Sequence, residues 1–181
     1  MTDVAVILPG ARYTAQAPLL YWASVILEER GWHVHRVDWT IDAEAGGHPL
    51  DFVDEALHQA FDAAPTASRR LVVAKSFGSF ALPKAVELGI PGVWLTPVLT
   101  DDAVVAALRA AGPEHLAVGG TSDALWRPER VAGTGGGLLS IADADHALTV
   151  PGSWSSSIAA QSLAFQAIAE HLDGGRAHRS R

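Results

Sequence analysis

The chain has 181 residues, of which 49% are hydrophobic and 18% charged, so it can bury one hydrophobic core and fold as a single domain. A formal net charge of -7 at pH 7 argues against nucleic acid as a partner, because phosphate binding needs clustered Lys and Arg side chains. The sequence contains no cysteine, which excludes disulfides, a thiolate nucleophile and Cys-based zinc sites, and fits a reducing compartment.

The two ends of the chain predict a cytoplasmic protein. The N-terminus leads directly into a strand-like run at 4–8, without the basic segment and longer apolar stretch of a signal peptide. No apolar run reaches the roughly 18 residues of a membrane span, so we expect no membrane partner. Residues 174–181 are polar and begin with glycine, which predicts a flexible tail behind a single domain at 1–173.

Short apolar runs alternate with amphipathic stretches, a pattern typical of βα units around a largely parallel sheet. Most of the predicted strands are almost entirely apolar, as expected where helices cover both faces of a sheet. In chain order the sequence predicts strand 4–8, helix 15–30, strand 33–39, helix 50–64, strand 71–75, helix 77–89, strand 92–96, helix 101–111, strand 115–119, strand 137–142 and helix 153–172.

The strongest local signal for chemistry is Ser76, which follows an apolar strand and precedes a helix. Ala74 and Gly78 flank it at i−2 and i+2, where larger side chains would collide with neighbouring backbone in a tight strand–helix turn. Such a turn exposes the serine hydroxyl at the carboxyl end of the sheet. The alternative is a serine that only caps the following helix.

This segment resembles the nucleophile elbow of the α/β-hydrolase superfamily, whose usual pattern is G-x-S-x-G and in which Ala74 would replace the first glycine. The superfamily places nucleophile, acid and base in that order along the chain. Gly120-Thr121-Ser122-Asp123 resembles the strand-end loop that carries the acid, and Asp143-Ala144-Asp145-His146 resembles the loop that carries the base. The resemblance therefore implies a catalytic triad of Ser76, Asp123 and His146 at one edge of a parallel sheet.

Other acidic and imidazole side chains have simpler interpretations. Asp143 and Asp145 are expected to shape their own loop, and Asp101 and Asp102 to cap a helix. The seven histidines besides His146 are expected to be structural or solvated.

The resemblance also implies an oxyanion hole that uses the backbone N–H of Phe77 and an N–H from the loop after the first strand. There the family often has His-Gly, whereas this chain has Pro9-Gly10; we expect Ala11 to be the donor, with Gly10 as the second choice. Four side chains in loops near the predicted cleft could either line an acyl pocket or pack in the core: Tyr13, Leu99, Trp126 and Trp154.

The fold implied by the resemblance is an α/β three-layer sandwich around a mainly parallel six-stranded sheet in the order 2-1-3-4-5-6, a minimal α/β-hydrolase fold. The short segment 94–101 leaves no room for a lid, so we expect an open, shallow site. Trimmed members of this kind are similar to small bacterial hydrolases of the dienelactone-hydrolase-like and related groups, although true dienelactone hydrolases use cysteine where this chain has Ser76.

The function expected from the sequence is hydrolysis of a carboxylic ester or thioester of a small-molecule acyl substrate, without metal or cofactor. Two other hypotheses remain open at this point. One is a binding or interaction protein that keeps the fold with weak or no activity, and the other is a flavodoxin-like nucleotide binder built from the same alternating units.

Overall fold

A single six-stranded sheet organises the chain, in the spatial order β2-β1-β3-β4-β5-β6, and every neighbouring pair of strands is parallel. The structure, a computed structural model, describes residues 2–177, with side chains through residue 174. The strands are β1 (Thr2–Leu8), β2 (His33–Arg36), β3 (Ala67–Lys75), β4 (Gly92–Leu95), β5 (His115–Gly120) and β6 (Gly137–Ile141). The predicted strand order is confirmed.

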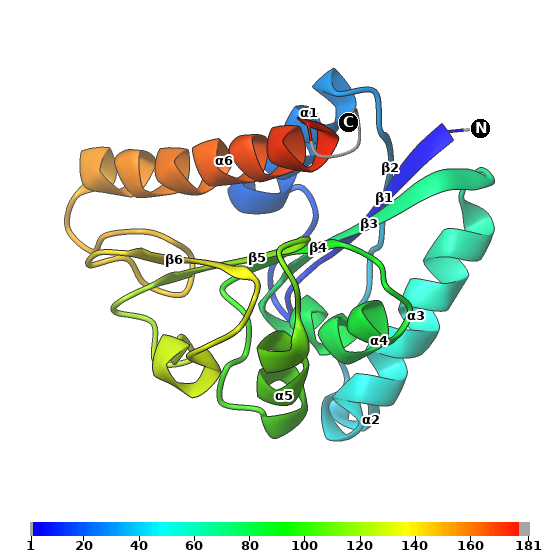
Figure 1. Ribbon diagram of the computed structural model, residues 1–181. Coiled ribbons are helices and arrows are strands. Elements are labelled where there is room, and N and C mark those ends of the chain that lie inside the picture. Colours follow the sequence, from blue (N-terminus) through cyan, green and yellow to red (C-terminus); the bar gives the residue numbers. More distant parts are fainter. Residues whose placement is uncertain (1, 178–181) are drawn as a thin grey trace.

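Helices cover both faces of this sheet and complete three layers (Figure 1). α1 (Pro18–Glu29) and α6 (Trp154–Ala177) pack together on one face. The opposite face carries α3 (Pro49–Ala63), α4 (Leu82–Glu87) and α5 (Asp102–Ala110). Three short elements complete the description: α2 (Ala43–Gly47) and the 3-10 helices η1 (Ser76–Ala81) and η2 (Pro128–Val131).

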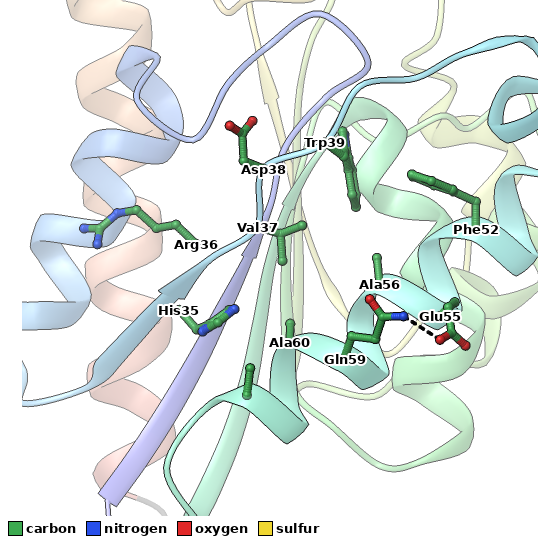
Figure 2. A pocket seen from close by; sticks show the side chains of 11 residues that line it. His35, Arg36, Val37, Asp38, Trp39, Phe52, Glu55, Ala56, Gln59 and Ala60 are labelled. Carbon is green, nitrogen blue, oxygen red and sulfur yellow. Dashed lines mark hydrogen bonds between the residues drawn. The ribbon is translucent and has the colours of Figure 1, made fainter.

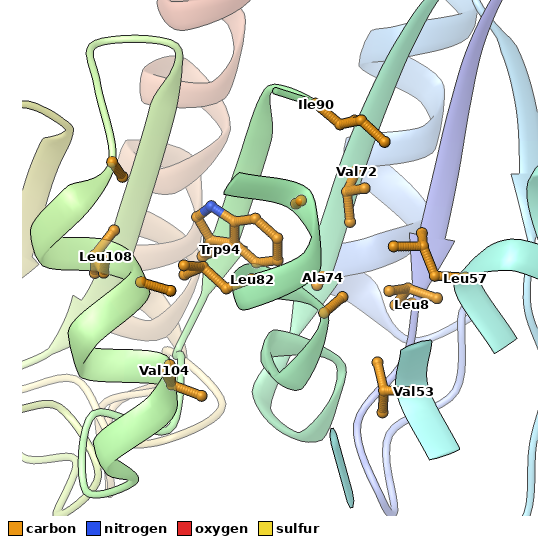
Figure 3. Close-up of a cluster of buried hydrophobic side chains, with 14 of the residues drawn as sticks. Leu8, Val53, Leu57, Val72, Ala74, Leu82, Ile90, Trp94, Val104 and Leu108 are labelled. Atoms are coloured by element: carbon orange, nitrogen blue, oxygen red, sulfur yellow. The ribbon is translucent and has the colours of Figure 1, made fainter. Parts of the chain in front are cut away.

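The sheet separates two hydrophobic clusters, because successive side chains of a strand point to opposite faces. On the face of α3, α4 and α5, Trp94 is the largest fully buried side chain and lies against Leu82 and Leu108 (Figure 3). On the other face, Val73 and Val118 pack under α1 and α6. This burial on both sides explains why the central strands read as continuous apolar runs.

Several element boundaries differ from the predictions. β2 ends at Arg36 instead of Trp39, because the chain there turns away from β1 after one last hydrogen bond from Val37 N–H to the Ile7 carbonyl. The helix predicted at 77–89 is divided between η1, which already begins at Ser76, and α4. Pro83 therefore stands in the first turn of a new helix, where its missing N–H is tolerated.

The C-terminal helix is longer than predicted. α6 continues to Ala177, so the predicted boundary between domain and tail at 173/174 falls within the helix, and residues 178–181 of the predicted tail lie outside the described residues. The α2 and η2 turns were not predicted.

The connection from β4 to α5 is a short turn at residues 96–101, which confirms that no lid is inserted there. None of the described helices combines the length and the apolar character needed to cross a membrane.

Candidate active site

Ser76 occupies a strained turn between β3 and η1. Its φ angle is 53°, in the left-handed region that non-glycine residues rarely adopt. Ala74 is fully buried in the sheet, and a Cβ at Gly78 would lie 2.6 Å from the carbonyl oxygen of Leu8. The small residues on either side of Ser76 therefore let the turn sit directly on the end of β1.

A continuous chain of hydrogen bonds joins the three residues that the sequence analysis singled out. Ser76 Oγ lies 2.7 Å from His146 Nε2, and His146 Nδ1 lies 2.7 Å from Asp123 Oδ2. Asp123 is almost fully buried, and its other oxygen accepts a hydrogen bond of 2.9 Å from the Leu125 amide. With both carboxylate oxygens occupied, Asp123 holds the imidazole in one orientation toward Ser76.

The loops that carry Asp123 and His146 are bonded to each other. The Ser122 amide donates to the Ala144 carbonyl (2.9 Å), and the Asp143 amide donates to the Thr121 hydroxyl (2.9 Å). Gly120 is required at this contact, since a Cβ there would overlap the Ala144 carbonyl oxygen. Asp123 and His146 are thus positioned as one unit, although they belong to different βα units.

Asp145 braces the turn on which His146 stands, as the sequence analysis expected. Its carboxylate accepts hydrogen bonds from the Ala147 amide (2.8 Å), the Thr149 amide (2.9 Å) and the Thr149 hydroxyl (2.8 Å). Burial alone would raise the pKa of Asp145, but the bonds from Thr149 and Ala147 outweigh it and lower the pKa. Asp101 caps α5 as predicted, by accepting from the Ala103 and Val104 amides.

The loop after β1 lies beside the elbow and contains two predicted oxyanion donors, Gly10 and Ala11. Its backbone hydrogen bonds distinguish between them. The Gly10 amide already donates to the Tyr13 carbonyl (3.0 Å), whereas the Ala11 amide makes no backbone hydrogen bond within the described part of the chain. The Gly10 carbonyl accepts from Trp39 Nε1 at 3.3 Å. Phe77 is the second residue of η1, a position at which an amide has no partner inside its own helix.

Lys75 is a site residue that the sequence analysis did not identify. It directly precedes Ser76, it is only 3% exposed, and its ammonium group lies 4.8 Å from the centre of the Tyr13 ring. Burial lowers the pKa of Lys75 to about 8, although the nearby negative charges of Asp123 and Asp145 oppose this change.

The four predicted pocket residues do not gather at one place. Leu99 is fully buried and Trp126 nearly so, both within the cluster around Trp94, and the Trp126 indole donates to Ser140 Oγ (2.9 Å). Trp154 is 82% exposed at the start of α6. Tyr13 contacts the elbow through Lys75.

The other described histidines differ in burial: His33, His48 and His58 are exposed, and His35 and His171 are half-buried. His115 is buried in the core, where it accepts a hydrogen bond from Trp94 Nε1 (3.2 Å), and burial lowers its pKa. His178 lies outside the described residues. Among the described residues, no three His, Cys, Asp or Glu side chains come together in a way that could hold a metal ion.

A groove of about 520 Å³ lies between β2 and α3, on the α3 side of the sheet (Figure 2). Trp39 and Phe52 form one end of it, with their ring centres 5.5 Å apart. Both rings also contact Phe77, at 6.0 and 6.2 Å between ring centres. Two aromatic side chains that line this groove therefore contact Phe77, the residue next to Ser76.

Solved structures share this fold, although no protein-family model and no curated protein matches the sequence. XCC1541 from Xanthomonas campestris pv. campestris, a candidate hydrolase of the α/β superfamily, is 21% identical over 96% of this chain and 99% of its own, with a TM-score of 0.67. Est1E from Butyrivibrio proteoclasticus, solved with ferulic acid bound, is 14% identical over 97% and 90% of the two chains (TM-score 0.71). XC6422 from Xanthomonas campestris, a serine hydrolase without lid, is 15% identical over 95% and 84% (TM-score 0.64).

Proposed function

We propose that this chain, which has the α/β-hydrolase fold without a lid, is a serine hydrolase that cleaves a carboxylic ester or a thioester through a Ser76 acyl-enzyme. The observation that carries the proposal is the unbroken chain of hydrogen bonds from Asp123 through His146 to Ser76, with both key distances at 2.7 Å. This chemistry requires first that the nucleophile lies within hydrogen-bond distance of the base, and second that a third group orients the base.

In the acylation step, His146 Nε2 takes the proton of Ser76 as Oγ attacks the carbonyl carbon of the substrate. The carbonyl π electrons move onto the oxygen, and the amides of Phe77 and Ala11 are the proposed donors to that oxyanion. When the intermediate collapses, the bond to the leaving alkoxide or thiolate breaks and His146 returns the proton to it. In deacylation, water attacks the carbonyl carbon of the acyl-enzyme as His146 takes a proton from it. The bond to Ser76 Oγ then breaks, His146 returns the proton to Ser76, and the carboxylic acid leaves.

Asp123 accepts the Nδ1–H of His146 throughout this cycle, which leaves the lone pair of Nε2 directed at Ser76. It also stabilises the imidazole while that ring is positively charged. Its own side chain is 2% exposed, so water competes weakly for this bond.

The proposal is tested by labelling the folded protein with a fluorophosphonate and locating the modified residue by mass spectrometry. We expect modification of Ser76 in the wild type, none in Ser76→Ala, and unchanged labelling in the control Ser155→Ala, which removes an exposed serine of α6. A folded wild-type protein that stays unlabelled refutes the proposal.

A panel of short and long acyl esters and thioesters then tests turnover and separates the two substrate classes. Hydrolysis should disappear in His146→Ala. Turnover that persists in this variant would assign the activity to another site.

A further inference from the structure

Lys75 has a position that the proposed mechanism leaves unused. It is the last residue of β3, and by strand alternation it shares a face with Val73, under α1, whereas Ala74 faces α3 and α4. A lysine in this place is unusual because burial penalises its charge, and with 3% exposure Lys75 is among the few buried polar residues of the protein.

The lysine supports the loop that carries the proposed oxyanion donor. Tyr13, whose ring lies under the ammonium group, is fixed at two points: its hydroxyl accepts the Leu19 amide (2.9 Å), and its carbonyl accepts the Gly10 amide (3.0 Å). The lysine stem passes beside Gly10, where an added Cβ would lie 3.5 Å both from Lys75 Cδ and from Ser76 Cβ. The loop from Gly10 to Tyr13 therefore rests on this side chain.

The positive charge of Lys75 is not neutralised by a direct contact. The described part of the chain offers it neither an ion pair nor a hydrogen bond, and the charged groups that face it are the carboxylates of Asp123 and Asp145, each already bonded elsewhere. Burial raises the pKa of the Tyr13 hydroxyl, so the phenol stays neutral under the ammonium group. In such a low-dielectric place a charge acts strongly on its neighbours.

We propose that Lys75 is a positioning residue for the hydrolysis: its stem holds the Gly10–Tyr13 loop, and its ammonium charge favours the oxyanion that forms next to it. This rests on the proposed function. The charge lies on the side of the oxyanion loop, through Gly10 and Tyr13, while the imidazolium that forms at the same moment is paired directly with Asp123. The charge therefore stabilises the oxyanion more than it opposes the imidazolium.

The experiment compares the rate of Ser76 labelling by a fluorophosphonate between pH 6 and pH 10 in the wild type, in Lys75→Met and in the control Lys84→Met, which removes the only other lysine. Lys84 lies on α4 and forms ion pairs with Glu87 of the same helix and with Asp54 of α3, neither of which belongs to the elbow. For the wild type and the control we expect a rate that falls as pH rises through about 8, the pKa of Lys75.

Lys75→Met should label about 10- to 100-fold more slowly at pH 7 and should lack that fall at alkaline pH. A purely structural lysine would not move the pH profile. Equal rates and equal profiles in Lys75→Met and the wild type overturn the inference, while a wild type that is never labelled overturns the proposed function instead.

Tyr13→Leu provides a second variant in case Lys75→Met does not fold. It keeps the lysine and removes the ring that stabilises its charge, so the alkaline fall should begin at lower pH and the labelling rate should be reduced. An unchanged alkaline fall in a folded Tyr13→Leu protein also contradicts the inference.

Discussion

Replacing Lys75 by methionine should make the protein more stable at neutral pH while it slows the reaction. The perturbation removes a buried charge and keeps a flexible apolar stem of similar length. Folding lowers the pKa of Lys75 from its ordinary value of 10.5 to about 8, mainly because burial penalises the charged form. The folded wild-type protein therefore bears the free-energy cost of a buried charge, and the folded variant does not.

The size of the effect follows from that pKa difference. At about 1.4 kcal/mol for each pKa unit, a change from 10.5 to about 8 corresponds to about 3 kcal/mol. The contact of the ring of Tyr13 with the ammonium group is lost in the variant, and such contacts contribute about 1 kcal/mol. We expect the free energy of unfolding of Lys75→Met to exceed that of the wild type by about 2 kcal/mol at pH 7.

The sign of the pH dependence is fixed by proton binding. Between about pH 8 and pH 10.5 the unfolded chain holds the Lys75 proton more tightly than the native protein does, so the stability of the wild type rises with pH across this window. The cost is present in full below pH 8 and disappears above 10.5. The advantage of Lys75→Met should therefore shrink as the pH approaches 10.5.

Urea denaturation followed by Trp fluorescence at pH 7 and pH 10 measures both quantities, with Lys84→Met as the control for removal of a lysine. A variant that is less stable than the wild type at pH 7 would refute the reasoning. So would a stability difference that does not decrease between the two pH values.

Three other substitutions test the site and its support. Gly78→Ala should lower the free energy of unfolding by about 2 kcal/mol or more in urea denaturation, because the new methyl group would lie 2.6 Å from the Leu8 carbonyl oxygen. The control Gly46→Ala, whose new methyl group would have no atom closer than 3.9 Å, should be neutral or slightly stabilising. Equal effects of the two substitutions would contradict the packing argument. Thr96→Val should raise the melting temperature, because the fully buried Thr96 hydroxyl has no hydrogen-bond partner among the described residues. A lower melting temperature of the variant would show that the hydroxyl forms a hydrogen bond in the wild type. Asp123→Asn should reduce kcat in the ester assay by about 10³- to 10⁴-fold with little loss of stability. A smaller decrease in kcat would argue against an orienting role of Asp123.

The sequence predicted those candidate site residues that follow the end of a strand. Ser76, Asp123 and His146 each follow a nearly continuous apolar run, and parallel strands bring such ends to one edge. The order of the sheet was predictable for the same reason. The hydrogen bonds that join these three side chains could be observed only in the structure.

Contacts between loops were not predictable, because they depend on the arrangement of several βα units at once. The Trp39 indole reaches the Gly10 carbonyl across 29 positions of sequence, and no local pattern indicates that bond. Lys75 was missed for a related reason: its charge suggests exposure, and its burial follows from the Tyr13 loop that covers it. Leu99 and Trp126 lie in predicted loop segments, yet both are packed into the core.

If the proposed mechanism holds, the separation of Ser76, Asp123 and His146 along the chain determines when an active molecule can first exist during synthesis. Ser76 and the residue that takes its proton are 70 positions apart, and Asp123 lies between them. A growing chain that ends after β3 and η1 contains Ser76 but not His146. Under the proposed mechanism, hydrolysis can begin only after the segment behind β6, which carries His146, has been synthesised and the sheet is complete.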